Sequence, residues 1–177
     1  MGFGPAQGDS VAHGNFTIQA GASSSFYAPV TVANVNVTAV GNVGAGEDDL
    51  ITFSLPADVL SANGKAVHIT VWGSTANNAA AKTLKVYFGT QIVLTNALTA
   101  SIAGLWRVEA IVVRTGAATQ DWHSQLVTLG VAAVALNDVE IGTATQDETT
   151  ALTIKCTGEA TSNNDILQEG LIVELLN

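Results

Sequence analysis

The chain has 177 residues and a mass of 18.1 kDa, which predicts a single domain. Fifteen acidic and six basic side chains give a net charge of −9, so the chain lacks the basic surface that binding to nucleic acid or to an anionic membrane requires. Apolar residues make up 47% and charged residues 12%, with a mean hydropathy of +0.34, which indicates apolar surface covered by self-association.

Residues 1–26 are rich in Gly, Ser, Ala and Gln, a composition that does not build a core. The segment contains three separated aromatic side chains, Phe3, Phe16 and Phe26. We therefore expect an extended N-terminal arm over residues 1–26, anchored on a neighbouring molecule by these rings. The first residues lack the basic and apolar regions of a signal peptide, so we expect synthesis in a reducing cytoplasm.

From residue 27 the pattern changes to alternating polar and apolar residues with many Val and Thr, which predicts β-strands. Within residues 66–73, Val67, Ile69 and Val71 share one face, and residues 41–49 are expected to form a Gly-rich acidic loop. About nine strands are predicted, at residues 30–40, 50–55, 66–73, 83–89, 91–95, 105–115, 120–130, 149–157 and 168–176.

Amphipathic helix patterns and fixed-period repeats are both missing from the sequence. The predicted fold class is therefore all-β, an antiparallel β-sandwich of the jelly-roll type over residues 27–177, preceded by the extended arm.

Candidate metal ligands do not have the spacing of known sites. His13, His68 and His123 are far apart in the sequence and match no zinc pattern. The acidic runs at residues 47–49 and 147–148 lack the alternating spacing of a calcium loop, so we expect them to lie in solvated loops.

The single cysteine, Cys156, alternates in phase with Leu152 and Ile154, which predicts a small buried side chain rather than a reactive thiol. The sequence contains no spacing of nucleophile, base and orienting group on which a reaction could rest. We expect no enzymatic activity, no metal and no cofactor.

Four aromatic residues of the domain are candidates for contact with a partner: Trp72, Tyr87, Trp106 and Trp122. Trp72 and Tyr87 alternate with Val71 and Val86, which predicts that they point outward. The aromatic residues fit three interpretations: anchors of a subunit interface, core residues, or a platform on which a sugar ring stacks. Interface anchors are favoured, because such residues are enriched there.

Several segments together resemble a small virion protein of tailed bacteriophages. They are the run from Phe53 to Leu60, the run from Ile69 to Gly89 with its T-x-W-G-x-x-A-x-N-x-x-x-K-x-L pattern, the run from Glu109 to Gln120 with R-T-G-A, and the ending from Asn163 to Asn177. The resemblance covers about residues 50–177. It implies a jelly roll or β-sandwich, usually trimeric, that decorates the head or the tail of the particle.

We therefore expect a capsid decoration (cement) protein that clamps neighbouring major capsid subunits on the exterior of a phage head. Its expected partners are itself, as a homotrimer, and the major capsid protein, with no nucleic acid and no membrane. The alternative is a trimeric tail-fibre or tail-tip protein, or a carbohydrate-binding module that recognises a receptor glycan. The number of copies in the particle separates these classes.

Overall fold

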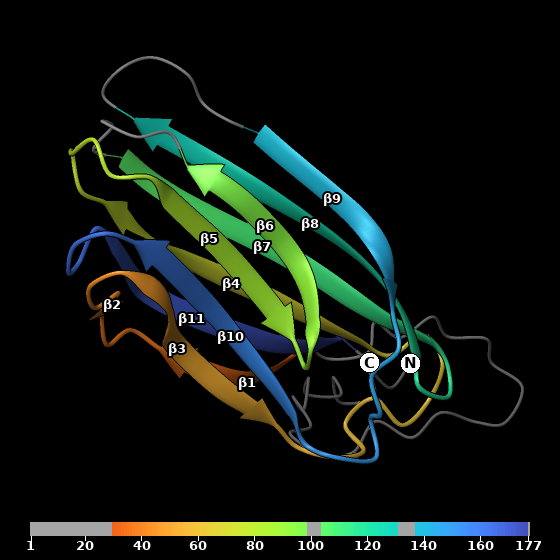
Figure 1. The fold of residues 1–177 in the computed structure, drawn as a ribbon. Coiled ribbons are helices and arrows are strands. Elements are labelled where there is room, and N and C mark those ends of the chain that lie inside the picture. Colours follow the sequence, from red (N-terminus) through yellow and green to blue (C-terminus); the bar gives the residue numbers. More distant parts are fainter. Residues whose placement is uncertain (1–29, 99–103, 131–136, 177) are drawn as a thin grey trace, which may run out of the picture.

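The computed structural model describes residues 30–98, 104–130 and 137–176, and these form two antiparallel sheets packed face to face (Figure 1). The predicted arm, with Phe3, Phe16 and Phe26, lies outside the described residues. The large sheet has the order β1 (Thr31–Asn36), β11 (Ile166–Leu176), β4 (Ala66–Thr75), β7 (Gly104–Gly116), β8 (Thr119–Gly130) and β9 (Asn137–Ala144), with β2 (Val40–Gly41) also paired to β11. The small sheet has the order β3 (Gly46–Leu55), β10 (Leu152–Ala160), β5 (Lys82–Phe88) and β6 (Gln91–Leu98).

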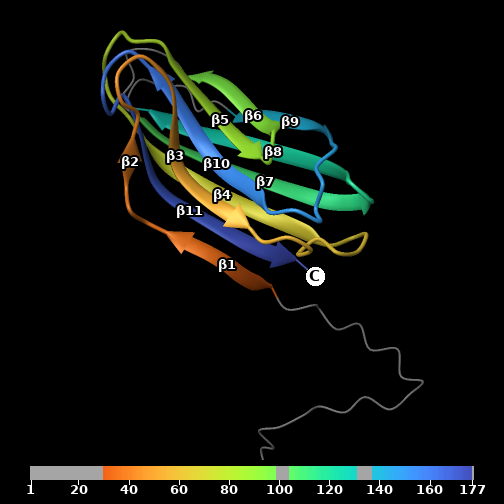
Figure 2. The same cartoon turned by 60° about the horizontal axis from the view of Figure 1, so that its bottom comes forward.

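The strand pairing is that of a jelly roll. The outermost strands of the chain pair with each other (β1 with β11), and the pairing then nests inward through β3 with β10 and β4 with β7 to the hairpin of β5 and β6. These four pairs alternate between the large and the small sheet, as a rolled-up hairpin requires. Strands β8 and β9 continue the large sheet beyond β7, so β1 and β9 lie at its opposite edges (Figures 1 and 2). The predicted all-β antiparallel sandwich of the jelly-roll type is confirmed for the described residues.

Alternation in the sequence accounts for the core. Val67, Ile69 and Val71 of β4 are each at most 1% exposed, and they face Leu84, Val86 and Phe88 of β5 across the interior of the sandwich. Side chains at every second position of a strand share one face, so each strand contributes one buried row. The described residues include no helix long and apolar enough to cross a membrane.

Two differences from the predicted strands involve acidic residues. Strand β3 begins at Gly46 rather than at residue 50, so the acidic run at residues 47–49 lies within a strand and not in a loop. Strand β9 was not predicted at all. Its inward positions include Asp138 and Glu140, so it lacks the buried apolar row that identifies a strand in the sequence.

Buried polar clusters close the two ends of the sandwich. At one end, Lys82, which is 1% exposed, donates to the Asn78 side chain at 2.8 Å and to the Ala80 carbonyl at 3.1 Å. Asn78 in turn donates to Asp165. Burial alone would raise the pKa of Asp165, but hydrogen bonds from Asn78 and from the Ser162 backbone lower it below its ordinary value.

At the other end, Glu148 corrects the prediction of a solvated loop at residues 147–148. Its side chain is 7% exposed and accepts hydrogen bonds from the Ala118 backbone at 2.9 Å and from Gln120 at 2.5 Å. Arg114 lies 3.6 Å from the same carboxylate. A buried carboxylate is tolerated only with partners of this kind, so this loop is tied to the β7–β8 turn.

Candidate binding surface

The outer face of the large sheet carries rows of aromatic, charged and apolar side chains that point away from the core. Register places Trp72, Arg107 and Val127 side by side on β4, β7 and β8, and places Leu105 directly opposite Leu129 in the next row. The neighbouring positions on each strand point into the core, because successive side chains alternate between the two faces. Each of these strands thus has one face that packs in the core and one face that is open to solvent.

Trp72 is fixed on this face by a glycine. It lies opposite Gly170 on β11, where an added Cβ would come within 2.0 Å of the Trp72 ring. Only glycine therefore leaves room for the indole to lie over the neighbouring strand. A β-bulge between Gln168 and Gly170 turns Glu169 to the same face, where its carboxylate accepts a 2.8 Å hydrogen bond from Ser74.

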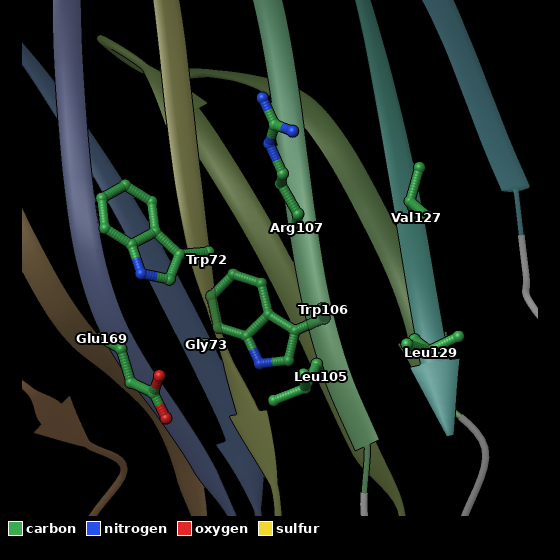
Figure 3. Close-up of a pocket in the computed structure, with 8 residues that line it drawn as sticks. All are labelled: Trp72, Gly73, Leu105, Trp106, Arg107, Val127, Leu129 and Glu169. Carbon is green, nitrogen blue, oxygen red and sulfur yellow. The ribbon is translucent and has the colours of Figure 1, made fainter. Parts of the chain in front are cut away.

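These residues surround a hollow of about 360 Å³ (Figure 3). It is lined by Trp72, Gly73, Leu105, Trp106, Arg107, Val127, Leu129 and Glu169. Arg107 is already paired with Glu109, and Glu169 with Ser74. Most of the lining is hydrocarbon and aromatic, which suits an apolar side chain of a partner better than a densely hydroxylated ligand.

Exposed apolar side chains continue from the hollow toward the β9 edge. We call the following five residues the apolar patch: Leu105, Val127, Leu129, Val139 and Ile141. Their exposed fractions run from 42% for Val127 to 78% for Ile141, high for residues of this type within strands.

The opposite edge of the large sheet is apolar as well. Val30, Val32, Val35 and Val37 lie in or beside β1, and each is more than half exposed. In the described part of the chain β1 pairs only with β11, so its other side is an open sheet edge. Such an edge is a template for a further strand from another chain.

The outer face of the small sheet has a different character, because it is charged and internally paired. Glu47 accepts hydrogen bonds from Tyr87 at 2.6 Å, from Thr157 at 2.7 Å and from Lys85. Burial alone would raise the pKa of Glu47, but these hydrogen bonds lower it to about 2. Lys155, bonded to Asp49 at 2.6 Å, also lies 5.0 Å from the centre of the Tyr87 ring.

The structure separates the four candidate aromatic residues. Trp72 is partly exposed beside the hollow, and Tyr87 is partly exposed in the Glu47 cluster. Trp106 and Trp122 are 2% and 9% exposed and belong to the hydrophobic core. This corrects the prediction that they offer their rings to a partner: Trp106 alternates in phase with the buried residues Val108, Ala110 and Val112.

The histidines do not converge. His68 lies 2.9 Å from Glu174 on the outer face of the large sheet, His123 lies two strands away on β8, and His13 is outside the described residues. Among the residues that the structure describes, no three His, Cys, Asp or Glu side chains are placed to hold a metal ion. Cys156 is fully buried, as predicted, and its burial raises the pKa of the thiol.

The residues of the apolar patch and of the β1 edge carry no local sequence pattern that marks them as a surface for contact. The alternation of Asp138, Val139, Glu140 and Ile141 was visible, but a period of two does not show which row faces inward. No sequence pattern places Glu169 on the outer face, because the β-bulge between Gln168 and Gly170 determines where its side chain points.

No family model matches the sequence, and no curated protein matches it significantly. Among solved structures, the chain is similar to the CBM2 module of the evolved Dit protein of Lactobacillus casei BL23 phage J-1, with 10% identity over 71% of this chain and 69% of that one and a TM-score of 0.41. It is also similar to peanut lectin, with 7% identity over 83% and 90% and a TM-score of 0.33. A third similar structure is the VP2 subviral particle of infectious bursal disease virus, with 13% identity over 84% and 41% and a TM-score of 0.26.

Proposed function

We propose that the protein is a capsid decoration protein, which binds across neighbouring major capsid subunits on the outside of a tailed-phage head. The observation that carries this proposal is the β1 edge, with four valines exposed by more than half at the point where the described fold follows the N-terminal segment. In this proposal the protein is a homotrimer made in the bacterial cytoplasm, and it has no enzymatic activity and needs no metal.

In this proposal the β1 edge and the segment before it bind the capsid together. An open strand edge adds a partner strand through main-chain hydrogen bonds, and exposed side chains such as Val32 and Val35 then provide the apolar contact. Phe3, Phe16 and Phe26 would each contribute roughly 1.5–3 kcal/mol when fully buried in a seam between capsid subunits. Several weak contacts in one trimer act together, since each raises the effective concentration of the next.

The β1 edge can be tested with the full-length chain. The double variant Val32→Asp, Val35→Asp places two charges on the proposed contact without touching the core, and Thr52→Asp on the exposed face of β3 serves as the matched control. In co-sedimentation with expanded capsids, we expect the double variant to lose binding and Thr52→Asp to retain it. Equal binding by both variants would contradict a role for this edge.

A second candidate function is recognition of a receptor glycan at the hollow. The partly exposed Trp72 ring beside Arg107 and Glu169 favours it, because an aromatic face with nearby polar groups is a usual sugar platform. The pairing of Arg107 with Glu109 and of Glu169 with Ser74 counts against it. Glycan-array binding that disappears in Trp72→Ala would favour this function over capsid decoration.

A further inference from the structure

In strand β9 acidic side chains point inward and apolar side chains point to solvent, the reverse of the usual arrangement in a two-layer sandwich. Its inward carboxylates are held by β6: Asp138 accepts a 2.7 Å hydrogen bond from the Asn96 side chain, and Glu140 accepts a 2.9 Å hydrogen bond from the Thr95 backbone. The alternating positions Val139 and Ile141 consequently point to solvent, 60% and 78% exposed. Two hydrogen-bonded carboxylates fix this register, since a slip of one residue would turn them outward.

The exposed side chains of β9 are continuous with those of β8 and β7. Val139 lies opposite Gln125, which is two residues along β8 from Val127 and is the next outward-facing position. Leu129 lies opposite Leu105 on β7. The same face therefore presents a ridge at the β9 edge and, two strands further in, the hollow beside Trp72. A ridge and a hollow on one face allow the ridge of one copy to enter the hollow of the next.

We propose that the apolar patch is the interface between copies of this chain, with Val139 and Ile141 of one copy packed in the hollow of its neighbour. This inference rests on the homo-oligomeric state in the proposed function. Because ridge and hollow lie on one face, a twofold axis would pair them reciprocally in a dimer. The homotrimer of the proposed function instead requires a head-to-tail (heterologous) contact, and such contacts close into rings when the rotation between copies allows it. A threefold ring is the smallest closed assembly of this kind.

Area and charge favour a second copy as the occupant. In a head-to-tail contact one partner contributes the ridge and the other contributes the hollow. At on the order of 100 Å² per exposed side chain, the two ridge residues supply about 200 Å² and the three patch residues at the hollow supply about 300 Å². The polar rows around them must supply the rest of the roughly 800 Å² per partner of a standard interface. Arg107 and Glu109 beside the patch neutralise each other. The five patch side chains are uncharged, and Glu169, the carboxylate that lines the hollow, accepts a hydrogen bond from Ser74. Two copies with a net charge of −9 can therefore meet at this face with little contact between like charges.

Position separates this surface from the one proposed for the capsid. The β1 edge and the β9 edge lie at opposite ends of the large sheet (Figure 1). Five strand spacings of about 4.8 Å place them roughly 24 Å apart. A ring formed through β7–β9 would leave β1 of every copy free to contact the capsid.

The test measures the mass of the full-length protein in solution at micromolar concentration by mass photometry. The variants are Ile141→Asp, Leu129→Asp and the milder Ile141→Thr, with Val35→Asp as the control of similar exposure at the opposite edge. We expect the wild type and Val35→Asp to be oligomers, the two patch Asp variants to raise the dissociation constant roughly 100-fold or more, and Ile141→Thr to fall between. Circular dichroism checks that each variant keeps its β-sheet signal.

Two results would overturn the inference. Patch variants that keep the wild-type mass would assign the oligomer to another surface and leave the homotrimer proposal standing. A wild type that is monomeric would reject both the interface and the homotrimer, while capsid binding through β1 is decided separately by the Val32→Asp, Val35→Asp variant.

Discussion

Replacing Glu148 by alanine removes the anion at the centre of a buried cluster. Arg114, whose side chain is 17% exposed, would lose its carboxylate partner but keep the Leu60 carbonyl at 2.8 Å and the Gly116 carbonyl at 3.0 Å. The Ala118 N–H, in a turn with φ of 50°, would lose its acceptor. Breaking a buried ion pair typically costs 3–5 kcal/mol, and the remaining acceptors of Arg114 place our expectation at about 3 kcal/mol. For a chain of this length that lowers the Tm by roughly 6–12 °C.

The assay is urea and thermal unfolding at pH 7, followed by circular dichroism. Glu148→Gln keeps the shape and one acceptor oxygen, so its loss should be about 1–2 kcal/mol. Glu159→Ala, at an exposed position on β10, should stay within about 0.5 kcal/mol of the wild type. A Glu148→Ala protein within about 1 kcal/mol of the wild type would refute the assignment of this carboxylate to a buried cluster.

Three further predictions concern the stability of the domain. The pKa of Glu47 is lowered from 4.5 to about 2, so ionised Glu47 stabilises the fold above pH 4.5. This contribution, about 1 kcal/mol after solvent screening, is lost as the pH falls toward 2. Glu47→Gln should therefore flatten that part of the acid-unfolding curve. Gly73→Ala would put a Cβ 1.9 Å from the Leu167 carbonyl, so unfolding in urea should show a loss of about 3 kcal/mol, whereas Gly116→Ala, with its nearest neighbour at 3.6 Å, should change little. The Cys156 thiol should react with a thiol reagent only after denaturation, and rapid reaction in the native protein would contradict its burial.

The sequence was sufficient for the sandwich because most of its strands bury one row of side chains. In β4 and β5 the buried rows follow the alternation of Val, Ile, Leu and Phe without interruption, and the turn at Asn63-Gly64 falls between elements, with Gly64 at a positive φ of 88°. Trp106 could also have been placed in the core from its phase with Val108. The enrichment of large aromatic residues at interfaces led instead to the prediction that Trp106 contacts a partner.

The candidate surface was much less accessible to sequence reasoning. The inward direction of Asp138 and Glu140 depends on amide partners on β6, more than forty positions away in the chain. The position of Glu169 depends on a bulge, and that of Trp72 on a glycine of another strand. Contacts between residues distant in the sequence decide each of these cases, and a local pattern does not contain them.

Counting the copies bound to expanded capsids of a tailed phage that carries the gene is the decisive measurement for the proposal of capsid decoration through the N-terminal segment and the β1 edge. Cryo-electron microscopy with mass spectrometry of the purified particles would compare the intact protein with a variant lacking residues 1–26. We expect many copies of the intact protein at regular positions on the head, and loss of decoration by a shortened protein that still folds. Full occupancy by the shortened protein would contradict the role of the segment, and failure of the intact protein to bind capsids would contradict the function itself.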